Sequence, residues 1–87
     1  MEATGDASAD EPAAQSLQRG DKGPEVTELQ LRLRELALYI GEADGDYNGQ
    51  VEDAVTRYQW ARGITADELG VYGRTTRASL EAETSEP

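Results

Sequence analysis

Three stretches of the chain carry helical signals, and in the first two of them apolar side chains recur at helical spacing. The first stretch lies within residues 20–40, the second runs from about Gln50 to Ala61, and the third begins near Thr75. The apolar positions are Val26, Leu29, Leu33 and Leu36, then Val51, Ala54, Val55 and Tyr58, and finally Ala78 and Leu80. Residues three and four positions apart share one face of an α-helix, so the first two stretches predict helices with a buried side. The third helix is predicted from Thr75 as its N-cap, with Ala78 and Leu80 as its apolar residues. The pattern therefore predicts an all-α fold, a small three-helix bundle.

The residues at the ends of these stretches support the helix predictions. Pro24 suits the first turn of the first helix, because the N–H that proline lacks has no helical partner there. We expect Gly41 to end the first helix and Gly63 to end the second. Thr75 is expected to cap the start of the third helix.

Two short segments resemble each other at an offset of 25 residues, "LYIGEADGDYNGQVEDAV" and "ITADELGVYGRTTRASL". Gly45 aligns with Gly70, and Tyr47 aligns with Tyr72. Each copy is a glycine turn that leads into a helix, and the copies are too few for a solenoid. We therefore expect two similar Gly-rich loop–helix corners that face each other.

Two glutamines follow apolar residues on the predicted buried faces, Gln30 in the first helix and Gln59 in the second. A buried amide group is found almost always with hydrogen-bond partners. We therefore expect each glutamine to bond the backbone of a nearby loop.

The formal net charge of −10 lies mostly at the two ends of the chain. Residues 1–16 hold four acidic side chains and residues 81–87 hold three, with no basic side chain in either range. Because the first segment also lacks spaced large apolar residues, we expect a disordered acidic linker at 1–15, a folded domain at 16–82 and a frayed tail at 83–87. The mildly acidic domain lacks the basic composition that phosphate contacts need, so nucleic acid is not an expected partner.

The sequence gives no sign of a membrane segment. Its longest apolar run, "LALYI", is far shorter than the roughly 20 residues of a membrane helix. The N-terminal stretch "MEATGDASADEPAAQ" is acidic and lacks the apolar region of a signal peptide. An exported protein would therefore carry this chain as an excised or engineered piece.

The composition argues against catalysis. Cysteine and histidine are both absent, which removes thiolate and imidazole metal ligands and the commonest general base. Serine and threonine hydroxyls have no histidine to activate them, and catalytic carboxylates need a cleft that raises the pKa of one of them. We therefore predict no catalytic residue, no metal, no cofactor and no enzyme activity.

One segment, "DGDYNGQVEDAV", starts like the calcium-binding loop of an EF-hand, with three oxygen-bearing side chains at alternate positions before a glycine. The twelfth position, which must supply a bidentate carboxylate, is Val55. We therefore favour a turn in which Asp44 and Asn48 cap backbone groups, while Gly45 and Gly49 take positive φ. Weak calcium binding by this loop stays open.

Four motifs occur in order along residues 16–82. They are an opening of Leu17, Gly20, Gly23, Val26, Leu29, Gln30 and Leu33, a corner of Asp44, Gly45 and Tyr47, the pair Tyr58 and Gln59, and an ending of Gly70, Gly73, Thr76 and Leu80. Together they resemble the peptidoglycan-binding domain found beside bacterial cell-wall hydrolases. The resemblance implies a noncatalytic module, located in the cell envelope or secreted, that holds an attached cell-wall enzyme or envelope protein on peptidoglycan. We expect the module to be a monomer.

From the resemblance and the positions of the two corners, we predict seven ligand-binding residues: Asp44, Tyr47, Asn48, Trp60, Arg62, Tyr72 and Arg74. For Trp60, contact with a sugar, a peptide stem or a partner domain competes with a role as a lid over the loop at 63–67. For the two tyrosines, ligand contact through the hydroxyls competes with core packing. For the polar residues, recognition of amide or carboxylate groups competes with a purely solvated role.

A second class of function is also compatible with the sequence. An acidic chain with an exposed tryptophan and a detached linker is typical of a protein-interaction or prodomain-like module that packs on a partner domain.

Overall fold

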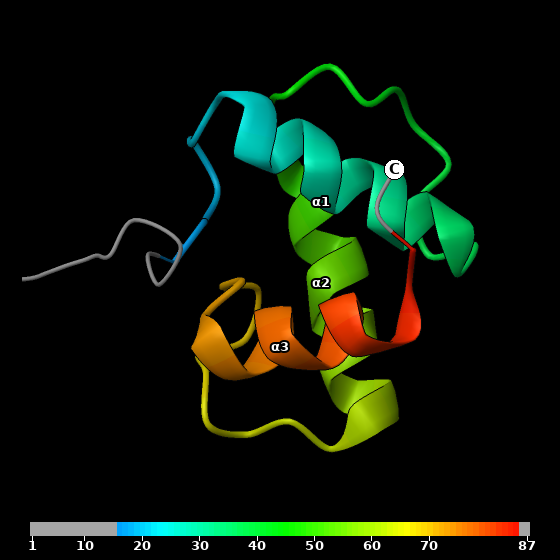
Figure 1. Ribbon diagram of the computed structural model, residues 1–87. Helices are drawn as coiled ribbons and strands as arrows, with labels where there is room; N and C mark the ends of the chain where they lie inside the picture. The colour runs from blue at the N-terminus through cyan, green and yellow to red at the C-terminus, as the bar shows by residue number, and fades with distance from the viewer. Residues whose placement is uncertain (1–15, 86–87) are drawn as a thin grey trace, which may run out of the picture.

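The computed structural model describes residues 16–85. This part of the chain forms three helices, α1 (Pro24–Glu35), α2 (Gly49–Arg62) and α3 (Arg74–Glu83), and has no β-strand. Figure 1 shows α2 running across the molecule, with α1 and α3 lying over it one above the other. The predicted all-α fold of three helices is confirmed. The predicted linker at 1–15 lies outside the described residues.

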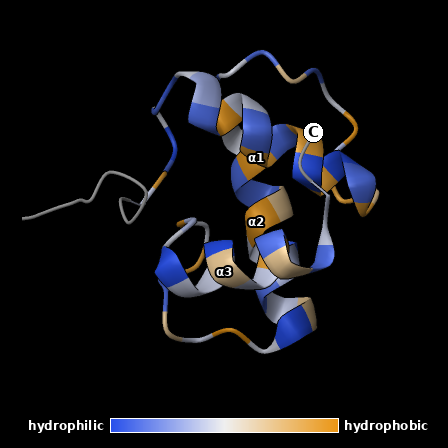
Figure 2. Cartoon of the chain, viewed as in Figure 1, coloured by the Kyte–Doolittle hydropathy of each residue, from blue (hydrophilic) through white to orange (hydrophobic). Residues whose placement is uncertain are grey.

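The buried faces of the helices meet in a single core. It contains most of the apolar positions that the sequence pattern singled out, among them Tyr58. The other three tyrosines, Tyr39, Tyr47 and Tyr72, also lie in this core. Figure 2 shows hydrophobic residues where the helices face one another and hydrophilic residues along their outer sides. None of the three helices is long and apolar enough to cross a membrane.

The first helix ends earlier than the sequence predicted, at Glu35 instead of near Gly41. Ala37 has a φ of 61°, a left-handed conformation that closes the helix and is uncommon outside glycine. The chain then turns Tyr39 back into the core, where 4% of its surface is exposed. Gly41 has a different role, because a Cβ atom there would lie 2.6 Å from the Tyr39 hydroxyl oxygen. The prediction that Gly41 ends the helix is therefore wrong.

The ends of α2 follow the sequence prediction closely. The side chain of Asn48 accepts a hydrogen bond of 3.1 Å from the backbone N–H of Val51 and so caps the helix. Gly63 ends the helix with a φ of 68°. Gly45 has the expected positive φ of 79°, but Gly49 lies in the first turn of α2, so the predicted positive φ for Gly49 is wrong.

The cap of α3 comes from a residue that the helix pattern did not reveal. The helix begins at Arg74, and its N-cap position is Gly73 instead of Thr75. The carboxylate of Asp67 accepts hydrogen bonds from the backbone N–H and the hydroxyl of Thr76, both at 2.7 Å. A Cβ atom on Gly73 would lie 2.5 Å from Asp67, so the glycine makes room for this carboxylate. The Thr75 cap is wrong because the preceding loop supplies the acceptor.

The two corners adopt similar structures, as the internal repeat predicted. Gly45 and Gly70 have φ values of 79° and 81°, and Tyr47 and Tyr72 are both buried. The hydroxyl of Tyr47 donates a hydrogen bond of 2.6 Å to the carbonyl oxygen of Gly70, which joins one corner to the other. Burial raises the pKa of Tyr47, so this hydroxyl keeps its proton.

Each corner is held by a buried glutamine, which confirms the prediction for Gln30 and Gln59. The Oε1 of Gln30 accepts from the N–H of Gly45, and the Oε1 of Gln59 accepts from the N–H of Gly70, both at 2.9 Å. The Nε2 of each glutamine donates to backbone carbonyl oxygens of the same corner at 3.0 to 3.2 Å. The side-chain amides therefore fix the loop backbones from inside the core.

The end of the described chain packs against α1 instead of fraying from residue 83. Helix α3 itself includes Glu83. Thr84 accepts a hydrogen bond of 2.7 Å from Arg32, and the N–H of Ser85 donates one of 2.9 Å to Glu35. Figure 1 shows the chain passing from the end of α3 toward the end of α1. The folded domain thus extends beyond the predicted boundary at 82, and residues 86–87 lie outside the described part.

Candidate functional site

Trp60 stands on the outer face of α2, on the side opposite the buried Val51. Its exposed fraction is 67%, so it does not form a lid over the loop at 63–67. A flat aromatic surface presented to solvent is suited to stacking on a sugar ring or a planar peptide group. Of the two alternatives left by the sequence, contact with a ligand or a partner is the one compatible with this exposure.

Arg62 is occupied by contacts within the domain. Its guanidinium group forms a two-point ion pair with Glu83 at 2.5 and 2.7 Å and lies 5.1 Å from the centre of the Tyr58 ring. Glu83 also accepts a 2.6 Å hydrogen bond from the Tyr58 hydroxyl. Arg62 and Tyr58 together lower the pKa of Glu83 to about 2. This cluster fastens α2 to α3, so Arg62 is committed to the fold.

Asp44 and Asn48 form hydrogen bonds that hold the first corner. The carboxylate of Asp44 accepts hydrogen bonds of 3.1 Å from Gln30 and from the N–H of Asp46. The Gln30 hydrogen bond is the largest of the effects that lower the pKa of Asp44. Asn48 caps α2, as described above, so both side chains cap backbone groups as predicted, although Gly49 does not take the positive φ. No cluster of three residues with metal-binding side chains occurs between residues 16 and 85.

The other predicted residues are divided between the core and the surface. Tyr47 and Tyr72 are 1% and 2% exposed and support the corners from within. Arg74 is exposed at the start of α3. The seven predicted residues are therefore spread over the core, the corners and the outer faces of two helices, and they line neither of the two recesses described next.

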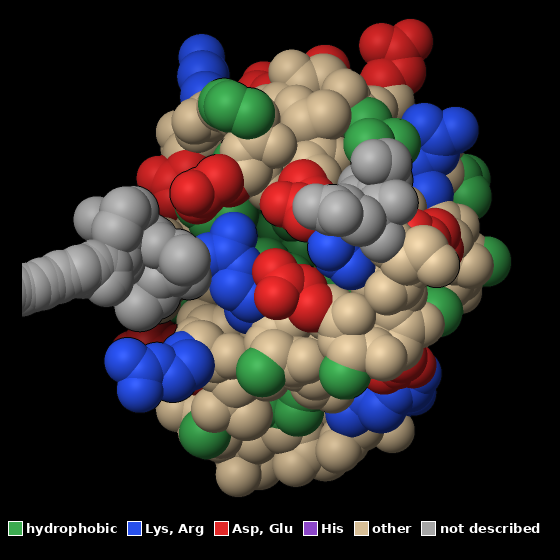
Figure 3. Space-filling model, viewed as in Figure 1, with side chains coloured by type: hydrophobic (Ala, Val, Ile, Leu, Met, Phe, Trp, Pro, Cys, Tyr) green, Lys and Arg blue, Asp and Glu red, His purple; other side chains and the backbone are tan. Residues whose placement is uncertain are grey.

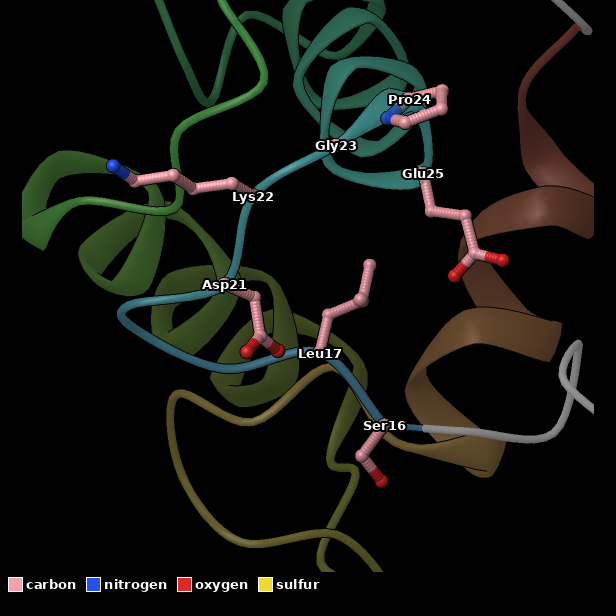
Figure 4. Close-up of a pocket in the computed structure, with 7 residues that line it drawn as sticks. All are labelled: Ser16, Leu17, Asp21, Lys22, Gly23, Pro24 and Glu25. Carbon is pink, nitrogen blue, oxygen red and sulfur yellow. The ribbon is translucent and has the colours of Figure 1, made fainter.

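The larger recess, of about 470 Å³, opens beside the start of α1 (Figure 4). It is lined by Ser16, Leu17, Asp21, Lys22, Gly23, Pro24 and Glu25. Figure 4 shows the Lys22 side chain extending away from Leu17 and from the two carboxylates of the group. The lining therefore holds two acidic side chains, Asp21 and Glu25, and one basic side chain.

A smaller recess, of about 180 Å³, lies between the loop that follows α1 and the first half of α2. It is lined by Leu38, Tyr39, Ile40, Gln50, Asp53, Ala54 and Arg57. The sequence reasoning missed this site because it placed residues 36–40 inside a helix. The available signal was the spacing of Asp53, Arg57 and Trp60, which puts all three on the outer face of α2.

Charged side chains of both signs are mixed over the molecular surface. On the face drawn in Figure 3, acidic and basic groups alternate around the middle of the domain. Several charged side chains of the domain form ion pairs, such as Arg77 with Glu25 and Glu81. The surface seen there carries no broad field of a single sign.

Comparisons with known proteins point to one family. A family model described as "Putative peptidoglycan binding domain" matches residues 22–80. The spore cortex-lytic enzyme of Halalkalibacterium halodurans is 35% identical over 71 residues, which cover 82% of this chain and 21% of that protein. The N-acetylmuramoyl-L-alanine amidase CwlM of Mycobacterium tuberculosis is 40% identical over 58 residues, which cover 67% of this chain and 14% of that protein.

A solved structure gives the same result. The crystal structure of the SleB N-terminal domain matches with a TM-score of 0.76 and 33% sequence identity, covering 83% of this chain and 96% of that one. The chain spans only about a fifth or less of the length of the two curated relatives, so it corresponds to one part of each.

Proposed function

The chain belongs to the family of peptidoglycan-binding domains, and we propose that it is a noncatalytic module that holds a larger cell-wall enzyme on peptidoglycan. The observation that carries this proposal is the family match over residues 22–80, which includes α1, α2, both corners and most of α3. The match therefore covers most of the folded domain, not one isolated motif.

The relatives support attachment to an enzyme that works outside the cytoplasm. Those described above are a spore cortex-lytic enzyme and an amidase, and each is several times longer than the matched region. We propose by analogy that this domain is joined to a catalytic domain and acts in the cell envelope. The catalytic chemistry would then belong to that other domain, since this chain contains neither histidine nor cysteine.

The exposed features of the domain fit a weak and repeated contact with a polymer. Trp60 offers a flat apolar surface, and the smaller recess beside it is lined by an acidic and a basic side chain, Asp53 and Arg57. A single contact of this size gives modest affinity, because ordering and desolvation offset much of the gain. Peptidoglycan repeats the same chemical unit, so rebinding at neighbouring units raises the effective concentration of the attached enzyme.

Cosedimentation with insoluble peptidoglycan stripped of anionic polymers tests the proposal. We expect the 87-residue chain to pellet saturably. Trp60→Ala is expected to pellet less, whereas Leu69→Ala, which truncates another exposed apolar side chain, serves as the matched control. Circular dichroism of each variant checks that the fold is intact.

A folded wild-type chain that stays in the supernatant at every peptidoglycan concentration would refute the wall-binding function. The exposed surface of α2 would then be tested for binding to an adjoining protein domain, which is the alternative class of function that the sequence allows.

A further inference from the structure

The small recess and Trp60 form one continuous surface along the outer side of α2. Gln50, Asp53 and Arg57 line the recess, and Trp60 follows Arg57 by three residues on the same face of the helix. The loop from Leu38 to Ile40 closes the opposite wall. Of the residues on this surface, Trp60 alone was predicted from the sequence as a binding residue.

Arg57 is the group in this recess that is best suited to bind an anion. Its side chain is exposed and makes no ion pair within residues 16–85, as is also true of Arg34 and Arg74, but Arg57 alone of these three lines a recess. A guanidinium group presents its N–H donors in a planar fork that matches the two oxygens of a carboxylate. The carboxylate of Asp53, one helical turn before Arg57, can accept a hydrogen bond from an N–H group that lies next to the carboxylate in the same ligand.

The size of the recess restricts what it can hold. Pockets that enclose whole small ligands measure roughly 300–1,000 Å³, and this recess measures about 180 Å³. It therefore suits one small residue at the end of a chain. Ala54 and Leu38 provide an apolar wall for a methyl group, and Ile40, which is 87% exposed, stands at the rim.

We propose that this recess binds the free carboxyl end of a peptide stem of peptidoglycan. Arg57 holds the terminal carboxylate with two hydrogen bonds, and Asp53 accepts the N–H of the same terminal residue. The methyl group of a terminal alanine lies against Ala54, and Trp60 packs on the part of the polymer next to the stem. This inference rests on the proposed wall-binding function and assigns its specificity to peptide stems that are not cross-linked at their carboxyl ends.

The larger recess beside α1 is a poorer site for the same group. Its lining holds two acidic side chains, Asp21 and Glu25, against one basic side chain, Lys22, which extends away from them (Figure 4), whereas the lining of the smaller recess holds one of each sign. The excess of negative charge disfavours a carboxylate in the larger recess. A comparison of the two recesses therefore provides an internal control.

The first test compares the pelleting of three chains on peptidoglycan: wild type, Arg57→Gln and Lys22→Gln. Each variant loses one exposed positive charge, so nonspecific charge effects are matched. We expect Arg57→Gln to bind roughly ten- to a hundredfold more weakly, as for loss of a hydrogen-bonded ion pair, while Lys22→Gln binds like wild type. Arg57→Lys, which keeps the charge but not the fork, is expected to lie between Arg57→Gln and wild type.

The second test uses the single tryptophan of the chain as the probe. A synthetic stem tetrapeptide ending in D-alanine is titrated into the protein, and the fluorescence of Trp60 is followed. The same peptide with a C-terminal carboxamide serves as the control ligand. We expect a saturable change with the free acid, a response weaker by tenfold or more with the amide, and no response in Arg57→Gln.

The outcomes separate this inference from the function on which it rests. If wild type does not pellet, the wall-binding function fails, and the inference fails with it. If wild type pellets and Arg57→Gln pellets equally well, or the amide binds as well as the acid, wall binding stands and the carboxylate site is refuted. A loss of binding in Lys22→Gln alone would move the site to the recess beside α1.

Discussion

Replacing Gln59 with leucine removes the side-chain amide that fixes the second corner while keeping a side chain of similar size. Gln59 is fully buried, and its Oε1 accepts the only hydrogen bond that the structure shows for the N–H of Gly70. The carbonyl oxygens of Glu68 and Val71 each keep one backbone partner after the change. One buried donor therefore loses its partner completely, and three acceptors, the two carbonyl oxygens and the Oγ1 of Thr76, each lose one hydrogen bond. The Thr76 hydroxyl keeps its bond to Asp67.

The expected cost follows from this count. A buried N–H without a partner costs about 1–3 kcal/mol, and each lost hydrogen bond to an acceptor that keeps another partner costs about 0.5–1 kcal/mol. The sum is roughly 2.5–6 kcal/mol, against a total free energy of unfolding of roughly 4–10 kcal/mol for a domain of this size. The melting temperature should fall by at least about 10 °C, because 1 kcal/mol corresponds to about 4–8 °C in a small domain.

Urea and thermal unfolding, followed by far-ultraviolet circular dichroism, measure this change. Gln50→Leu is the matched control, because Gln50 lies on the same helix but is exposed, and surface substitutions change stability by less than about 0.5 kcal/mol. A Gln59→Leu variant that unfolds at the same urea concentration as the Gln50→Leu control would show that the buried amide does not hold the corner, and the reasoning would be wrong.

Two further predictions concern the helix ends. Asn48→Ala should lower the free energy of unfolding by about 1 kcal/mol, because the N–H of Val51 loses its capping acceptor. Asn48→Asp keeps a side-chain oxygen at this position and should retain most of the stability. Urea unfolding of both variants measures the difference. Glu83 has a pKa of about 2 in the folded domain against an ordinary value of 4.5, so its contribution is complete above pH 4.5 and is lost as the pH falls toward 2. The stability difference between wild type and Glu83→Gln should therefore shrink over that range in urea titrations at several pH values, and a difference that does not depend on pH would contradict the ion pair with Arg62.

The resemblance carried by the motifs led to the family, and the periodic pattern led to the fold. Three helices, two glycine corners and the hydrogen-bonding role of both buried glutamines all follow from the sequence. The candidate site was predicted less well. Asp44, Asn48 and Arg62 were singled out for their position and polarity, and the structure engages them in caps and an ion pair. Arg57 was missed, although it lies one turn from Trp60.

Apart from the bonds of the two buried glutamines to their corners, the features that the sequence determined are local in origin. A buried stripe depends on residues three and four positions apart, and the cap by Asn48 joins residues three positions apart in the same turn. The positive φ of Gly45 and Gly63 depends on the missing side chain of each glycine itself. Such features can be predicted from a short window because the interacting groups are neighbours along the chain.

Tertiary structure decided the features that join distant segments. Ala37 closes α1 so that Tyr39 can enter the core, Asp67 reaches across its loop to cap α3, and Trp60 stays exposed because no other segment covers it in the described domain. The recess at Arg57 exists only because the loop at 38–40 packs beside α2. These contacts depend on which segments meet when the core is buried, and that choice is set by the packing of the whole domain and by no single stretch of sequence.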